Sequence, residues 1–201
     1  MICIINYEAG NLRSVQKAVE FSGARAVITS DPVEIARADK IIFPGVGAFG
    51  QAVEKIDQKH LREPLLDYIA TGRPFLGICL GMQLLFAGSE EDKTSRGLAV
   101  LQGRVKRFAH ELKVPHLGWN VLIPTRRSPL WEGIPQDSYF YFAHSYFFVP
   151  DDPAIVIGET EYGGRVPIAL QSKNIYGLQF HPEKSQKVGL QVLRNFINLK
   201  D

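Results

Sequence analysis

One cysteine in this chain lies where its sulfur could act as a nucleophile. Cys79 sits in the stretch Gly77-Ile78-Cys79-Leu80-Gly81, after an apolar run typical of a buried strand and before residues 82–87, which predict a helix ending at Gly88. Glycines two residues to either side permit a sharp strand-to-helix turn that lifts the cysteine above the sheet edge. At a helix N-terminus the dipole favours a thiolate, and the amide of Leu80 would point toward an oxyanion. We predict that Cys79 is a nucleophile, although a free cysteine is often an inert core residue.

A base and a carboxylate to orient it occur near the C-terminus. His181 and Glu183 are two apart, and Pro182 biases the residue before it toward extended backbone. Alternate side chains of an extended segment point the same way, with Cα atoms roughly 6.6 Å apart, so the Glu183 carboxylate can reach the imidazole. A carboxylate on one ring nitrogen leaves the other to take a proton from a thiol. Taken alone, His181 is more typical of a loop histidine and Glu183 of a surface charge. Taken together with Cys79, they predict a Cys-His-Glu triad.

The elements that must position these residues begin with an alternation of strands and helices. Strands are predicted at 2–5, 26–29 and 41–43, and helices at 12–22, after the Asp31-Pro32 N-cap, and at 48–57 and 61–71. This order predicts an α/β fold, with a mostly parallel open sheet and helices on both faces. Ligands of such sheets bind at the carboxyl ends of the strands, which is where the Cys79 turn lies.

From Gly97 onward the pattern changes to consecutive strands, which predicts an antiparallel portion added to the sheet. Strands are predicted at 97–108, 121–123, 138–149, 154–162, 166–171 and 175–180, with a hairpin turn at Gly163-Gly164. A last helix places Val188, Val192 and Phe196 on one face against the core. The length fits a single domain spanning 1–201.

Composition and charge argue against nucleic acid binding, a membrane protein and a disulfide-stabilised fold. The chain has 45% hydrophobic and 22% charged residues and a formal net charge of +2, which gives no reason to expect nucleic acid binding. Its two cysteines form no disulfide framework, no apolar run reaches membrane length, and no basic, apolar leader opens the chain. We therefore expect a cytoplasmic protein that does not contact a membrane. No Cys and His spacing suggests a metal, and we expect no cofactor.

The loop 45–50 formally matches Gly-x-Gly-x-x-Gly, the dinucleotide-binding pattern. That motif should follow the first strand, with an acidic ribose ligand ending the next strand, whereas here the nearest candidate, Asp67, lies in a helical pattern. Because the loop ends the strand that precedes the Cys79 strand, its amides are better placed to face the same oxyanion.

Several blocks resemble a known family. The segments 77–83 and 180–183, Gly-Ile-Cys-Leu-Gly-Met-Gln and Phe-His-Pro-Glu, resemble class I (triad-type) glutamine amidotransferases. Four further blocks, at 6–12, 44–49, 115–120 and 181–185, resemble the glutaminase subunits of imidazole glycerol phosphate synthase. The resemblance spans nearly the whole chain, and the second set of blocks is the more specific.

The resemblance implies a mechanism. Cys79 attacks the carboxamide carbon of glutamine, His181 shuttles protons, Glu183 orients His181, ammonia leaves, and water hydrolyses the thioester to glutamate. The amides of Leu80 and Val46 would form the oxyanion hole. Val46 stands where many other glutaminases have glycine, and a β-branched residue resists positive φ, so we expect the loop to adopt its active shape poorly on its own.

The resemblance also implies substrate-binding residues and a partner. The substrate-binding residues are Gly47, Gln83, Glu91, Ser145 and Tyr146, and an acidic side chain suits the α-ammonium of glutamine. The partner is a (β/α)8-barrel cyclase subunit, which receives the ammonia through a closed channel in histidine biosynthesis. The interface or gate candidates are Asn11, Ser14, Trp119, Asn120 and Lys184.

Two observations bear on docking. Trp119 could equally be a core residue. Residues 139–142 alternate, so one face of that strand should be core and the other could be the apolar wall of a docking surface.

Other functions stay open from the residues alone. A glutaminase subunit feeding pyridoxal phosphate, purine or aminobenzoate synthesis would share the chemistry and differ in the synthase that copurifies. A cysteine peptidase of related fold would cleave peptides rather than free glutamine. A binding module built on the 45–50 loop would bind nucleotides and resist labelling by a glutamine-like electrophile.

Overall fold

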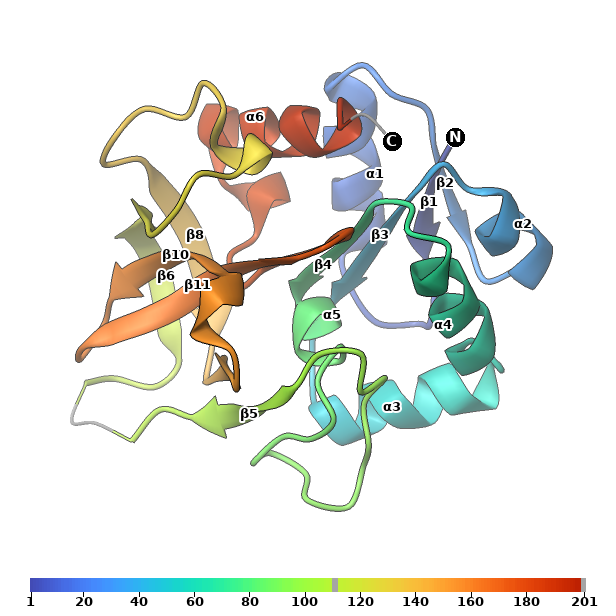
Figure 1. Cartoon of the computed structure of the whole chain (residues 1–201), viewed down its shortest axis with the longest axis horizontal. Coiled ribbons are helices and arrows are strands. Elements are labelled where there is room, and N and C mark those ends of the chain that lie inside the picture. Colours follow the sequence, from blue (N-terminus) through green and yellow to red (C-terminus); the bar gives the residue numbers. More distant parts are fainter. Residues whose placement is uncertain (110–111, 200–201) are drawn as a thin grey trace.

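An eight-stranded sheet runs through the molecule in the order β2-β1-β3-β4-β12-β11-β10-β7 (Figure 1). The computed structural model describes residues 1–109 and 112–199. The strands are β1 (Ile2–Ile5), β2 (Ala26–Thr29), β3 (Lys40–Gly45), β4 (Phe75–Cys79), β7 (Ile123–Pro124), β10 (Val156–Glu161), β11 (Arg165–Ser172) and β12 (Ile175–Leu178). The first five in spatial order are parallel, and β11, β10 and β7 add an antiparallel edge. The predicted fold class is confirmed.

Helices cover both faces of the sheet. The cluster on one face takes residues from α1 (Leu12–Phe21) and α6 (Gln186–Ile197), and the cluster on the other takes residues from α2 (Pro32–Arg37), α3 (Phe49–Gln58) and α4 (Arg62–Ala70). The predicted helix start at Asp31 is confirmed, because its carboxylate accepts a hydrogen bond of 2.8 Å from the amide of Val33. These layers bury β1, β3 and β4 completely, which explains why their sequences are continuous apolar runs.

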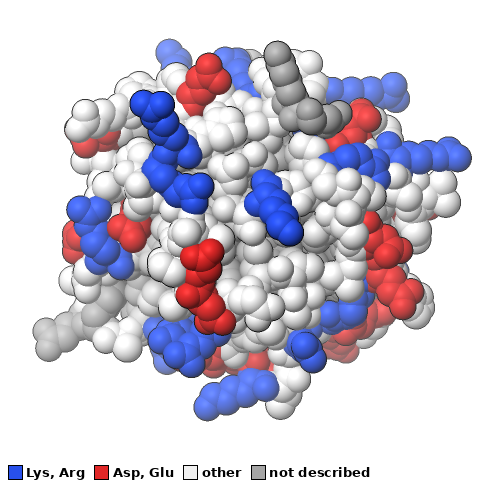
Figure 2. Space-filling view, in the orientation of Figure 1, with Lys and Arg blue, Asp and Glu red and all other residues white. Residues whose placement is uncertain are grey.

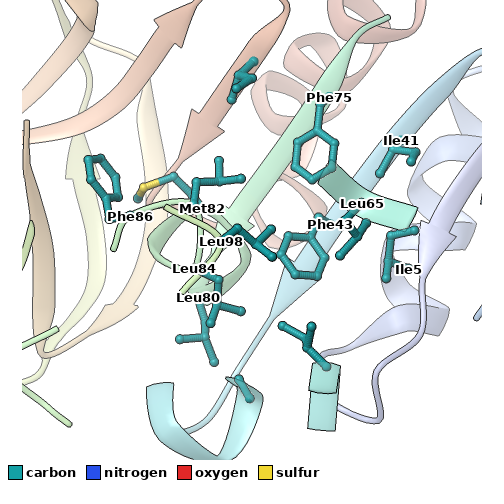
Figure 3. Packing of buried hydrophobic residues seen from close by; sticks show 14 of the residues in the cluster. Ile5, Ile41, Phe43, Leu65, Phe75, Leu80, Met82, Leu84, Phe86 and Leu98 are labelled. Atoms are coloured by element: carbon teal, nitrogen blue, oxygen red, sulfur yellow. The ribbon is translucent and has the colours of Figure 1, made fainter. Parts of the chain in front are cut away.

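The apolar cluster beneath the Cys79 turn fixes the position of that turn. Figure 3 shows Leu80, Met82 and Leu84 in one buried cluster with Phe43 and Phe75. The rings of the two phenylalanines meet edge to face with their centroids 5.8 Å apart. The residues that follow the nucleophile are therefore held by core packing.

The predicted helix over 82–87 is wrong in length. The helix α5 covers only Leu80–Gln83. It ends there because amides of a later segment of the chain bind the carbonyls of the residues that follow it. The carbonyl of Leu84 accepts a hydrogen bond from the amide of Leu98, at 2.7 Å, and that of Leu85 accepts one from Val100, at 2.9 Å. Tertiary pairing therefore overrides the local helical pattern.

Two short antiparallel ladders lie beside the main sheet. They are β5 (Gly103–Arg107) with β9 (Tyr146–Pro150), and β6 (His116–Val121) with β8 (Tyr139–His144). The predicted strand over 97–108 is thus shorter than expected, and the one over 138–149 is two strands. They separate at Ser145 because β8 and β9 pair with different partners. Three 3-10 turns complete the described elements: η1 (Pro129–Trp131), η2 (Pro153–Ile155) and η3 (Pro182–Lys184).

The surface mixes charges of both signs. On the face drawn in Figure 2, Lys and Arg side chains are interspersed with Asp and Glu. No helix in the described part of the chain combines the length and the apolar character that a membrane crossing requires.

Candidate active site

Cys79 lies at the end of β4 in a backbone conformation that few side chains adopt. Its φ is 53° and its ψ is −114°, and α5 starts at the next residue. A Cβ on Gly77 would lie 2.6 Å from the Cα of Met82, and one on Gly81 would lie 2.7 Å from the carbonyl carbon of Phe43. The two glycines are therefore required for close packing, as the predicted turn demands. Since α5 has only four residues, its dipole contributes less to a thiolate than the longer predicted helix would.

His181 follows β12 at the same edge of the sheet, and the chain fixes both its backbone and its ring. Its amide donates to the carbonyl of Tyr141 at 2.9 Å, and its carbonyl accepts from the Ser185 hydroxyl at 2.6 Å. Its Nδ1 lies 2.9 Å from Oε1 of Glu183, whose side chain is only 2% exposed. With Nδ1 engaged by the carboxylate, Nε2 is the nitrogen left for Cys79.

The charges at this site favour a protonated His181. Burial disfavours the imidazolium, but hydrogen bonds with Cys79 and Glu183 and the negative charges of both groups outweigh it and raise the pKa of His181 to about 10. A protonated His181 would stabilise a thiolate at Cys79 by its charge, and that ion pair is the reactive state of a cysteine nucleophile.

Two glutamines complete the surroundings of the sulfur, and one of them was not predicted. Nε2 of Gln179 lies 3.6 Å from Sγ of Cys79, and its Oε1 accepts from the amide of Gln83 at 3.0 Å. Gln83 also donates to the carbonyl of Tyr146 at 3.0 Å, which leaves its own carbonyl oxygen for a ligand. The alternation of Gln179 with His181 just past a buried strand was the available signal for Gln179.

The loop after β3 meets the Cys79 turn as predicted. Gly45 and Cys79 are paired residues of adjacent parallel strands. The next residue, Val46, is 43% exposed and faces the site, while Gly47 takes the positive φ in this loop, at 103°. Leu80, the first residue of α5, lines the same space.

A cavity of about 360 Å³ lies over Cys79. It is lined by ten of the predicted residues, namely Val46, Gly47, Cys79, Leu80, Gln83, Glu91, Ser145, Tyr146, His181 and Lys184, and by Pro115, Ala143 and His144. Its size suits a small polar molecule such as a free amino acid. Lys184, predicted at an interface, thus reaches the cavity itself. Among the described residues, no group of three His, Cys, Asp or Glu side chains could hold a metal ion.

Glu91 links the cavity to the loop that carries Val46. One carboxylate oxygen accepts a hydrogen bond of 2.9 Å from the amide of Phe49, the first residue of α3. The carboxylate therefore caps a helix whose N-cap, Ala48, has no side-chain oxygen. Its other oxygen remains for a cation in the cavity.

Asn120, His116 and His144 form a buried chain of polar groups that ends at the carbonyl of Tyr146. Nδ1 of His144 faces the carbonyl of Tyr146 at 2.9 Å and must donate to it. Nε2 of His144 therefore accepts from Nδ1 of His116 at 3.0 Å, and Nε2 of His116 accepts from the amide of Asn120 at 3.2 Å. Burial, followed by the nearby His116 and His181, outweighs the Tyr146 bond and lowers the pKa of His144 to about 3.

Of the predicted interface residues, Trp119 and Asn120 lie on opposite faces of the β6–β8 ladder. Trp119 is 47% exposed and packs edge to face on Tyr141, with the ring centroids 5.9 Å apart. The Lys184 ammonium lies 5.7 Å from the centre of the same ring. Asn120 points the other way, into the buried histidine chain. Asn11 and Ser14 lie at the start of α1, which contacts η3, the segment that carries Lys184.

The protein-family model described as glutamine amidotransferase class-I matches residues 4–199 of the chain. The imidazole glycerol phosphate synthase subunit HisH of Rhodopirellula baltica is 50% identical over 198 residues, covering 98% of this chain and 96% of that protein. The subunit HisH 1 of Methanococcus maripaludis is 48% identical over 203 residues, covering 99% and 100%.

Solved structures agree on the fold. A crystal structure of a glutamine amidotransferase superposes with a TM-score of 0.78 at 18% identity, covering 98% of this chain and 97% of that one. PurLQS from Thermotoga maritima gives a TM-score of 0.76 at 19% identity, covering 98% and 97%. The chain belongs to the class I glutamine amidotransferase family, among the HisH subunits of imidazole glycerol phosphate synthase.

Proposed function

We propose that this chain is the single-domain glutaminase subunit of a cytoplasmic imidazole glycerol phosphate synthase. It hydrolyses glutamine to glutamate and ammonia. The ammonia passes to a (β/α)8-barrel cyclase subunit that makes imidazole glycerol phosphate and aminoimidazole carboxamide ribonucleotide. The observation that carries the proposal is the buried pairing of His181 with Glu183 beside Cys79, under a cavity that also contains Glu91.

The first half of the reaction forms a thioester. The Cys79 thiolate attacks the carboxamide carbon, and the carbonyl oxygen becomes an oxyanion. The imidazolium of His181 then gives its Nε2 proton to the leaving nitrogen as the C–N bond breaks, so that ammonia departs. Glu183 keeps Nδ1 protonated and its ring in place throughout.

The second half returns the enzyme to its starting state. Neutral His181 takes a proton from water, the hydroxide attacks the thioester carbon, and the C–S bond breaks to release glutamate and the thiolate. Both tetrahedral intermediates place negative charge near the amides of Leu80 and Val46, two residues that line the cavity. Removing one such donor costs about 10²–10³ in kcat in other enzymes.

The cavity has complementary groups for free glutamine. Glu91 offers a carboxylate oxygen to the α-ammonium, and Gln83 offers a carbonyl oxygen to an N–H donor. Gly47, Ser145 and Tyr146 line the remaining wall. A peptide substrate would bury its own backbone in place of the α-ammonium and leave Glu91 without a cation, which argues against a peptidase.

The same region argues against a dinucleotide site on the 45–50 loop. The carboxylate of Asp92 packs so closely on Gly50 that a Cβ there would collide with it, and Glu91 already caps the start of α3. Two carboxylates at this helix N-terminus would repel a phosphate.

Docking of the cyclase fits the exposed face of the β6–β8 ladder. Leu117, Trp119 and Tyr139 are 59%, 47% and 57% exposed and share that face with Ala143, which lines the cavity. Phe140 and Phe142, on the other face, are fully buried, so the predicted core face of this strand is confirmed. The exposed apolar face thus adjoins Ala143, the cross-strand neighbour of Leu117 and part of the cavity wall.

A glutamine-like chloroketone provides the direct test. We expect it to alkylate Cys79 alone, with Cys3 unmodified by mass spectrometry, and free glutamine to protect against it. Cys3 is the matched control, because it is fully buried in β1. Labelling that glutamine does not slow, together with no ammonia release in the presence of the cyclase subunit, would overturn the proposal.

A further inference from the structure

Tyr7 holds a buried hydroxyl that nothing in the described chain satisfies. The residue follows β1, is fully buried, and packs its ring on Phe43 at a centroid distance of 5.2 Å. Its hydroxyl oxygen has no hydrogen-bond partner among the described residues. Leaving a buried hydroxyl unpaired destabilises the folded protein, and phenylalanine would fill the same space without that cost.

The position of this hydroxyl relates it to the predicted oxyanion hole. It lies directly against Gly45, where a Cβ would collide with it and would also come within 2.9 Å of the Gly81 amide and 3.0 Å of Cβ of Leu80. Tyr7 therefore lies behind the two segments that carry the predicted oxyanion amides. The described residues that line the cavity do not include it.

Peptide geometry predicts what the hydroxyl can bind. In a trans peptide the carbonyl of Gly45 and the amide N–H of Val46 point in opposite directions. When the Val46 N–H faces the cavity, the Gly45 carbonyl faces the interior, where it needs a donor. Burial, and after it the charge of Cys79, raises the pKa of Tyr7, so the phenol keeps its proton and remains a donor.

We propose that Tyr7 is a positioning residue, whose hydroxyl donates to the Gly45 carbonyl when the Val46 amide is turned toward the oxyanion. The inference rests on the proposed function. In that arrangement the unpaired hydroxyl gains its partner only in the conformation that is competent for catalysis. The bond would then stabilise the active loop conformation by the free energy of one buried hydrogen bond.

The test is Tyr7→Phe, measured in the full chain together with the cyclase subunit. We expect kcat for glutamine hydrolysis to fall about 3- to 10-fold, the effect of one hydrogen bond of ordinary strength, with KM unchanged. The melting temperature should stay the same or rise, because the resting protein loses an unpaired hydroxyl. Alkylation of Cys79 by iodoacetamide, which forms no oxyanion, should keep its rate.

Tyr68→Phe is the matched control. Tyr68 is also buried, but its hydroxyl donates to the carbonyl of Asp39 at 2.9 Å, away from the site. We expect this variant to lose about 2–4 °C in melting temperature and to keep its kcat. Tyr7→Phe should lower kcat without lowering the melting temperature, and Tyr68→Phe should do the reverse. This difference separates a positioning role from a structural one.

A double variant tests the loop directly. Val46→Gly should reduce the effect of Tyr7→Phe on kcat, because a glycine at that position reaches the active conformation without help. An unchanged kcat in Tyr7→Phe, or fully additive effects in the double variant, would overturn the inference. A wild-type complex that does not hydrolyse glutamine would instead overturn the proposed function.

Discussion

The carboxylate of Glu183 is one of two groups that keep His181 protonated in a buried site. Its Oε1 lies 2.9 Å from Nδ1 of the imidazole, and both side chains are almost completely buried. Glu183 therefore stabilises the imidazolium of His181 through both its negative charge and its hydrogen bond. A substitution can remove the charge and keep the hydrogen bond.

Glu183→Gln keeps an acceptor for Nδ1 and removes the negative charge. We expect the pKa of His181, about 10 in the wild type, to fall by a unit or more and kcat to fall about 10²-fold. NMR titration of the imidazole and the pH profile of glutamine hydrolysis measure the two effects. Glu20→Gln, an exposed carboxylate on α1, is the control and should change neither. A wild-type pH profile in Glu183→Gln would contradict the assigned role.

Single residues also mark the limit of sequence-based prediction. The Cys79 turn and the His181-x-Glu183 pair could be predicted because their spacing is local. Tyr7 could not, because its importance depends on which strands lie side by side at the sheet edge. Lys184 was predicted at an interface. It lies at the cavity because η3, the segment that carries it, contacts β8.

At the scale of elements, the β6–β8 ladder holds the buried chain from Asn120 through His116 to His144. This set of hydrogen bonds can form only while both histidines are neutral. If His144 were protonated, its Nε2–H would face the Nδ1–H of His116, and two donors would meet. Acid should therefore destabilise this ladder.

The pKa of His144 is about 3 in the folded protein and close to 6.5 when unfolded. Between these values only the unfolded chain binds the proton, so the free energy of unfolding falls as pH falls, by about 1.4 kcal/mol per pH unit. Urea titrations between about pH 5 and 6.5 should show a shallower slope for His144→Gln than for wild type. His60→Gln, at an exposed histidine, is the control and should keep the wild-type slope. Equal slopes in wild type and His144→Gln would contradict the neutral chain.

Elements were predicted best where local pattern and tertiary pairing agree. The parallel strands and their helices were correct, since continuous apolar runs and caps specify them. Residues 82–87 were predicted as a helix and residues 97–108 as a strand, yet α5 covers Leu80–Gln83 and β5 covers only Gly103–Arg107. Backbone pairing of Leu84 and Leu85 with Leu98 and Val100 decides that region, and a sequence pattern does not encode which distant amide takes a carbonyl.

At the scale of the whole molecule, one exposed face must bind the cyclase. Trp119 is the central aromatic of that face, beside Tyr141 and the Lys184 ammonium. We expect Trp119→Ala to weaken association with the cyclase subunit about 10- to 100-fold by calorimetry without lowering the melting temperature. Phe21→Ala is the control, since Phe21 is 70% exposed at the far end of α1 and should not matter. Equal losses in both variants would contradict this face as the interface.

The central claim is that Cys79 produces the ammonia that the cyclase uses. The most direct measurement is product formation by the complex with the cyclase's nucleotide substrate, for wild type and Cys79→Ala, with either glutamine or an ammonium salt. We predict that Cys79→Ala loses turnover with glutamine and keeps it with ammonium. Glutamine-supported turnover in Cys79→Ala would contradict the nucleophile, and wild-type glutamine cleavage that never feeds the cyclase would contradict the partner.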